Sequence, residues 1–179
     1  VPMSRFVQLE GRLTLTGANA DLRLRVRDSH LAAVAAALAH ELVVVRKVGP
    51  LAADASVGTA LSQYALDTVA AKAGLDPTAL RGLAAELAAA AGKAIVVAGG
   101  SASASTSGPA IELAALILNL SLGAFEAGLF EEASTPQVAT GGATALSSLA
   151  ADMQAGNVEL LVVAGANPVY DSPGALRFA

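Results

Sequence analysis

Two short apolar runs constrain the fold of this chain more than any other feature. Residues 94–98 and 160–164 contain no polar side chain, and each run is followed by a glycine. Strands without polar alternation are typical of parallel sheets that are covered by helices on both faces. A helix start follows each run, which predicts strand-loop-helix units near 94–122 and 144–179. We therefore expect an α/β fold with a mostly parallel, Rossmann-like sheet flanked by helices.

Capping signals and hydrophobic periodicity predict the remaining elements. Asp76 followed by Pro77 is a strong helix start, and Asp28 with Ser29 is another. The predicted strands are 5–10, 12–16 and 42–46. The predicted helices are 28–41, 59–73, 77–91, 109–122 and 144–155.

The chain of 179 residues has the length of one domain. It starts Val-Pro-Met, and the last helix starts at Ser172 and Pro173 without a C-cap before the final residue. We therefore expect residues 1–179 to be a single α/β segment of a longer subunit.

Composition excludes some functions. Hydrophobic residues make up 54% of the chain, but the longest dense run, 113–125, is shorter than the roughly 20 residues of a membrane span. The net charge of −4 argues against a nucleic-acid partner. Charged residues are only 15%, which indicates a surface partly covered by other protein. Without cysteine, this segment cannot ligate an iron-sulfur cluster through thiolates.

Two polar segments are candidate binding sites. The loop 99–108, which starts with Gly99 and Gly100, could hold an anion, but it matches neither a P-loop nor G-x-G-x-x-G and is interpreted as a plain connection. Arg23, Arg25 and Arg27 would project to one side of an extended segment. Such a stripe suits carboxylate or phosphate contacts, although an edge strand facing solvent or a partner subunit is the favoured interpretation.

No residue pattern indicates catalysis. His30 and His40 lie too far apart along one helix to share a metal ion, and neither has a partner at i+4. The chain has no G-x-S-x-G motif. We expect no catalytic residue and no metal ligand in this chain, and whether the parent protein is an enzyme is left open.

Two segments carry a resemblance to a known family. Residues 4–26, with Thr-Gly-x-x-Ala-Asp-x-Arg-Leu starting at Thr16, and residues 151–179 resemble the large iron-sulfur subunit of bacterial alternative complex III. That complex is a quinol:electron-acceptor oxidoreductase. Leu22 stands where the resemblance leads us to expect histidine.

The resemblance implies a molybdopterin-oxidoreductase-like domain that has lost its cofactor and serves as a scaffold. Gly165, Asn167 and Pro168, with Gly99 and Gly100, would then be vestigial contacts to the lost cofactor. Iron-sulfur clusters would lie elsewhere in the parent subunit. Multihaem cytochrome c subunits, which carry haem c, and integral membrane quinol-binding subunits would be the partners, on the periplasmic side of the bacterial cytoplasmic membrane.

Two other interpretations remain open. One is the cofactor-proximal domain of an active molybdopterin oxidoreductase or of the large iron-sulfur subunit of complex I. The other is a free-standing nucleotide-binding module, which would fold and bind nucleotide in isolation.

Overall fold

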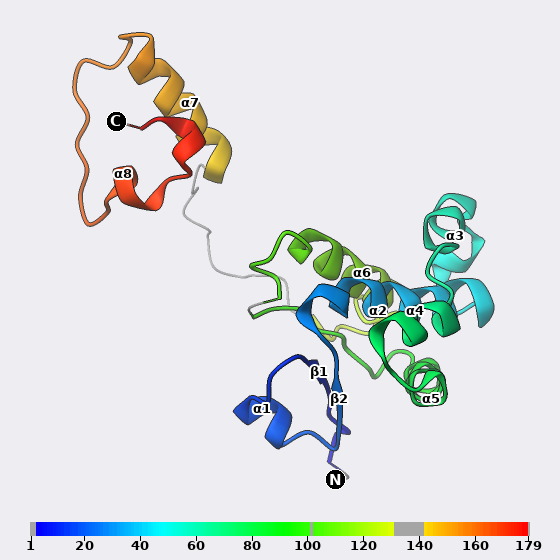
Figure 1. Cartoon of the computed structure of the whole chain (residues 1–179). Helices are drawn as coiled ribbons and strands as arrows, with labels where there is room; N and C mark the ends of the chain where they lie inside the picture. Colours follow the sequence, from blue (N-terminus) through cyan, green and yellow to red (C-terminus); the bar gives the residue numbers. More distant parts are fainter. Residues whose placement is uncertain (1–2, 101, 131–141, 179) are drawn as a thin grey trace. The chain divides into compact units, whose positions relative to one another are not determined.

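The computed structural model describes residues 3–100, 102–130 and 142–178. The chain divides into two compact units, Val1–Glu131 and Glu132–Ala179 (Figure 1). The first unit combines a small parallel sheet with several helices, so the mixed α/β class that the sequence predicts is confirmed.

The helices and strands follow one another in this order. The first unit contains β1 (Val7–Glu10), α1 (Leu15–Ala18), β2 (Leu22–Arg25), α2 (Asp28–His40), the π-helical η1 (Glu41–Val45), the 3-10 helix η2 (Pro50–Ala53), α3 (Ala55–Leu61), α4 (Leu66–Ala73), α5 (Pro77–Ala89) and α6 (Gly108–Ser121). The second unit contains α7 (Gly142–Gln154), α8 (Pro168–Asp171) and the 3-10 helix η3 (Gly174–Leu176).

The sheet is one parallel pair in the described residues. β1 and β2 pair from Val7 opposite Leu22 to Glu10 opposite Arg25. Residues 11–21 connect them, close to the minimum length for a parallel crossover. The strand predicted at 12–16 is wrong, because the Thr14 hydroxyl accepts a hydrogen bond from Gly17 N (3.0 Å) and starts α1 there.

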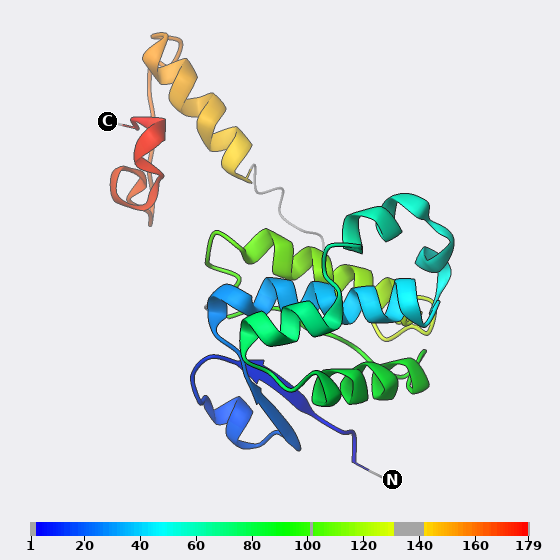
Figure 2. The same ribbon diagram turned by 45° about the vertical axis from the view of Figure 1, so that its right-hand side comes forward.

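Helix α2 forms the centre of the first unit. It lies between α6 and α4, and the two views agree on this arrangement (Figure 2). Val34 and Ala37 are fully buried in it, and Leu80 and Leu118 reach the same core from α5 and α6. Small alanine side chains let the helices approach closely, which explains why an alanine-rich sequence builds this core.

The strand predicted at 42–46 is also wrong. Helix α2 continues through it as η1, and Leu42 and Val43 are buried. A short β-branched run does not distinguish a buried strand from a buried helical turn, and here packing on the core decides. The helical segment Asp28–Val45 is long and apolar enough to cross a membrane by length and composition, and 44% of it is buried inside this unit.

The other predicted helices are confirmed with two corrections. The helix predicted to start at Ser172 and Pro173 is only the short 3-10 helix η3, and α8 ends just before Ser172. Helix α5 begins after Asp76, whose side chain accepts from Thr78 N at 2.8 Å. Helices α2, α6 and α7 lie where the sequence predicts them. The helix predicted at 59–73 is two helices, α3 and α4, because residues 62–65 turn between them.

The two apolar runs are not strands in this structure. Residues 94–98 and 160–164 have no regular secondary structure, and Val97 and Leu160 are each 81% exposed. A strand needs a partner ladder, and the described residues of neither unit supply one at these places. Asn119 instead bonds both backbone groups of Val96: its Oδ1 accepts from Val96 N (2.8 Å) and its Nδ2 donates to Val96 O (2.7 Å).

Candidate functional site

A cavity lies at the carboxyl end of β1, where parallel α/β proteins place their ligands. Its volume is about 390 Å³. Three segments form its wall: the loop after β1, the first turns of α2 with Asp28, and Gly99 with Gly100. The structure therefore brings the Gly99-Gly100 pair to the end of a parallel strand. We call this space the β1 cavity.

The wall of the β1 cavity includes a buried carboxylate, Glu10. Its Oε1 accepts from Arg23 Nε at 2.5 Å, and its Oε2 accepts from the Thr14 hydroxyl at 2.7 Å. Gly17 packs so closely that a Cβ there would lie within 2.8 Å of Oε1, Cδ and Oε2. This Glu10 cluster therefore joins β1, α1 and β2.

The Glu10 cluster explains the physical role of several residues in the Thr-Gly-x-x-Ala-Asp-x-Arg-Leu pattern that starts at Thr16. Gly17 makes room for the carboxylate, and Arg23 neutralises it. Asp21 Oδ2 accepts from Phe6 N at 2.7 Å, while Asp21 N donates to Phe6 O at 2.9 Å, just before the ladder starts. The role of Glu10 was not predicted from the sequence, although the spacing of Gly17 and Arg23 was a signal that could have indicated a buried carboxylate partner.

Acid should weaken the Glu10 cluster. The hydrogen bond from Arg23, followed by the one from the Thr14 hydroxyl, holds the pKa of Glu10 below its usual range. A carboxyl whose folded-state pKa is depressed stabilises the fold above its unfolded pKa, and this contribution is lost as the pH falls through the folded pKa. The hydroxyl and amide of Ser56 lower the pKa of Asp54 and act in the same direction.

We expect Glu10→Gln to lower stability at neutral pH and to flatten its decline in acid. Urea unfolding of both proteins at about pH 7 and about pH 3 measures this, with the two midpoints converging at the acid end. Glu86→Gln, which removes an exposed pair with Arg5, is the control and should change the midpoint little. If the unfolding midpoint of Glu10→Gln falls in acid as much as that of the unsubstituted chain, Glu10 does not cause the loss of stability.

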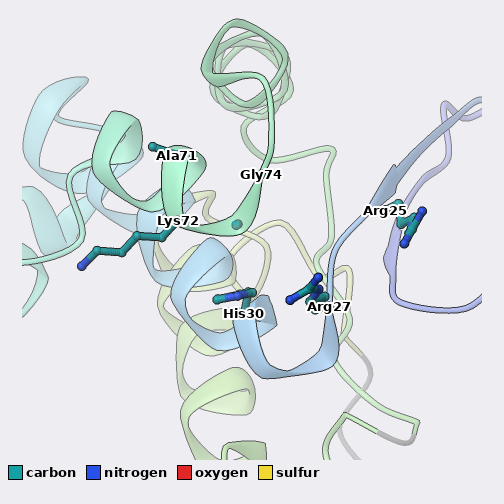
Figure 3. Close-up of a pocket in the computed structure, with 7 residues that line it drawn as sticks. Arg25, Arg27, His30, Ala71, Lys72 and Gly74 are labelled. Atoms are coloured by element: carbon teal, nitrogen blue, oxygen red, sulfur yellow. The ribbon is translucent and has the colours of Figure 1, made fainter.

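The arginine stripe is divided in the structure. Arg23 turns to Glu10, whereas Arg25 and Arg27 line a second depression of about 430 Å³. His30, Lys72 and the small residues Ala71, Ala73 and Gly74 complete this wall. We call it the basic depression. Figure 3 shows Arg27 beside His30 at the start of α2, with Gly74 across from them and Arg25 on β2 further out.

Two hydroxyls of the loop after Gly100, those of Ser103 and Ser105, form bonds close by. Ser105 Oγ donates to Ala102 O (2.6 Å), and Ser103 Oγ donates to Glu112 Oε1 (2.5 Å). A Cβ at Gly108 would collide with the Ser103 carbonyl. These contacts close the described part of the loop onto the start of α6.

The Gly165-Ala-Asn-Pro segment belongs to the second unit. Asn167 caps α8, since its Oδ1 accepts from Tyr170 N at 3.4 Å, and Pro168 occupies the first helical position. Gly165 has φ +69° and lies exposed, with open space where a Cβ would stand. Gln154 of α7 donates to the carbonyls of Leu176 (3.2 Å) and Arg177 (3.3 Å), which ties η3 to α7.

Neither histidine has a metal-ligand environment in the described residues, where no group of three His, Asp or Glu side chains converges. His30 lines the basic depression. His40 lies at the end of α2, and its buried Nδ1 has no hydrogen-bond partner among the described residues.

Comparisons of the chain with family models, with curated proteins and with solved structures found no match.

Proposed function

We propose that this chain is a scaffold: the cofactor-free, molybdopterin-oxidoreductase-like part of the iron-sulfur subunit of a quinol:electron-acceptor oxidoreductase. The observation that supports it best is the amount of apolar surface that the described residues leave uncovered. In the first unit the exposed apolar side chains include Ile95, Val97, Leu113 and Leu116, and in the second unit, taken by itself, they include Leu160 and Val162.

The apolar surface has the character of an interface. Leu113 and Leu116 stand one helical turn apart on α6, so they share one face. Ile95 and Val97 alternate with the more buried Val96, so they also share a face. Exposed apolar side chains that share one face are typical of surfaces that another protein covers. A subunit held by partners would bury them.

The polar residues of the family-like pattern fit the scaffold role. Glu10, Arg23 and Asp21 bond within the chain, where they hold β1, α1 and β2 together. Because these polar groups already bond within the fold, the pattern supports shared ancestry and a structural role more than a catalytic or ligand-binding role.

Under this proposal, the catalytic and redox centres lie in other parts of the parent subunit and in its partner subunits. Iron-sulfur clusters would lie elsewhere in the parent subunit, haem c in multihaem cytochrome subunits, and quinol oxidation in integral membrane subunits. The chain itself would sit peripherally on the periplasmic side of the bacterial cytoplasmic membrane. Its Rossmann-like ancestry is part of the same proposal.

Metal analysis of the intact complex tests this function. The parent protein, tagged and purified from membranes of its own organism, should carry iron and covalently bound haem and oxidise a quinol. Mass spectrometry should find no stoichiometric molybdenum. One molybdenum per complex would overturn the scaffold, and so would a parent protein that purifies alone without haem or quinol oxidation.

The β1 cavity favours a second candidate function, the cofactor-proximal domain of an active molybdopterin oxidoreductase or of the complex I large iron-sulfur subunit. Its position at the carboxyl end of a parallel strand, beside Gly99 and Gly100, is where such folds hold nucleotides. Stoichiometric molybdenum would select the enzyme. Nucleotide-dependent shifts of the amides at 99–108 in the isolated chain would select a nucleotide-binding module.

A further inference from the structure

The basic depression gathers positive charge from separate elements. Four cationic or ionisable side chains, Arg25, Arg27, His30 and Lys72, come from β2, the start of α2 and the end of α4, and the described residues that line it include no carboxylate. Bringing like charges together from separate elements is unfavourable unless a counter-charge is present.

The carboxylates that flank the depression in the sequence do not line it. Asp28 lines the β1 cavity instead, close to Gly11. Asp67 pairs with Arg81, and Asp76 caps α5. The ion pairs in the described residues involve neither Arg25 nor Arg27. The depression therefore has an excess of positive charge along its wall.

Two helix ends lie at the depression, and the N-terminal one favours an anion. Helix α2 has 13 residues and begins at Asp28 after the N-cap Arg27, which makes no side-chain capping bond, so the positive end of its dipole lies beside the arginines, with Asp28 in the first turn. Two backbone carbonyls in the last turns of α4 are already bonded: Leu75 N donates to Ala70 O (2.9 Å), and Gly74 N donates to Ala71 O (3.3 Å). Because these two carbonyls are bonded, the C-terminal end of α4 presents less partial negative charge to the depression.

We infer that the basic depression binds a phosphate-bearing anion. The planar guanidinium of Arg27 can bond two phosphate oxygens at once, and the adjacent imidazole of His30 can donate a further bond. Arg25 forms one rim. Lys72 forms the other and points away from His30 in Figure 3, so it contributes as a flexible point charge. A space of about 430 Å³ suits a single head group better than an extended acidic peptide.

Titration of the full chain tests the inference. Inorganic phosphate and pyrophosphate should shift the amide signals of His30 and Gly74 saturably. The phosphate could be a free anion or part of a lipid head group. Flotation with phosphatidylglycerol vesicles, compared with phosphatidylcholine vesicles, distinguishes these two sources. Binding to the soluble anions alone assigns a free phosphate, and binding to the anionic vesicles alone assigns a lipid head group.

Matched variants make the test specific. Arg27→Gln should weaken binding about tenfold, and Lys72→Gln should weaken it less. Lys93→Gln removes one exposed positive charge of the first unit that does not line the depression, and it should change binding less than about twofold. Circular dichroism verifies that each variant is folded. The inference fails if no probe saturates, or if Lys93→Gln loses as much affinity as Arg27→Gln.

Discussion

Gly17→Ala should lower the free energy of unfolding by about 3 kcal/mol, at the upper end of the range for overpacking a close-fitting site. The added Cβ would lie within 2.8 Å of three carboxylate atoms of Glu10. The carboxylate would have to move, and its bonds to Arg23 and Thr14 would break together. Backbone strain plays no part, because Gly17 does not have a positive φ.

Gly82→Ala is the matched control. Gly82 also stands inside a helix, α5, but a Cβ there meets nothing within 4 Å. Alanine has the higher helix propensity, so this variant should be more stable by about 0.5–1 kcal/mol. Urea unfolding followed by far-ultraviolet circular dichroism gives both values. If the two variants shift the midpoint in the same direction and by the same amount, the Glu10 cluster is not a tightly packed site.

Local signals predicted the helices because their causes are local. The Asp76-Pro77 start places α5 correctly, and the apolar face of the 28–41 segment places α2. The strand prediction at 42–46 was wrong because the conformation of this run does not have a local cause. Its residues are compatible with either a strand or a buried helical turn, and packing against the core decides between them.

The candidate sites were only partly predictable. Gly99 and Gly100 could be recognised as a loop after an apolar run, but that the loop would meet the end of β1 depends on tertiary packing. The three arginines are evenly spaced in the sequence, yet within the part of the chain that the structure describes only Arg23 pairs with a carboxylate. Its partner is Glu10, thirteen residues away, and the parallel pairing of β1 with β2 brings the two together.

Asn119 explains why 94–98 has a fixed place without a strand partner. Its side-chain amide is buried and acts toward Val96 as a neighbouring strand would, accepting from N and donating to O. Asn119→Leu should therefore cost about 2 kcal/mol, because two backbone groups lose their partners at once. Amide hydrogen exchange at Val96 should become about 30-fold faster, which measures the loss at that site.

Asn119→Asp separates hydrogen bonding from packing, since the two side chains have nearly the same shape. A carboxylate can accept from Val96 N, but only its protonated form can also donate to Val96 O. The unfolded chain ionises this group above about pH 4, whereas the folded chain favours the protonated form. The penalty of the substitution should therefore be small in acid and grow as the pH rises.

This pH dependence runs opposite to that of the unsubstituted chain, which loses the Glu10 contribution as the pH falls. The stability difference between the two proteins should narrow from about pH 7 to about pH 4, as measured by urea midpoints at each pH. Asn157→Asp makes the same change at an exposed position and should show no such trend. A constant difference for Asn119→Asp would mean that the amide does not donate to Val96. Segment 94–98 would then be held by the bond from Val96 N to Asn119 Oδ1 and by the packing of Ala94 and Val96.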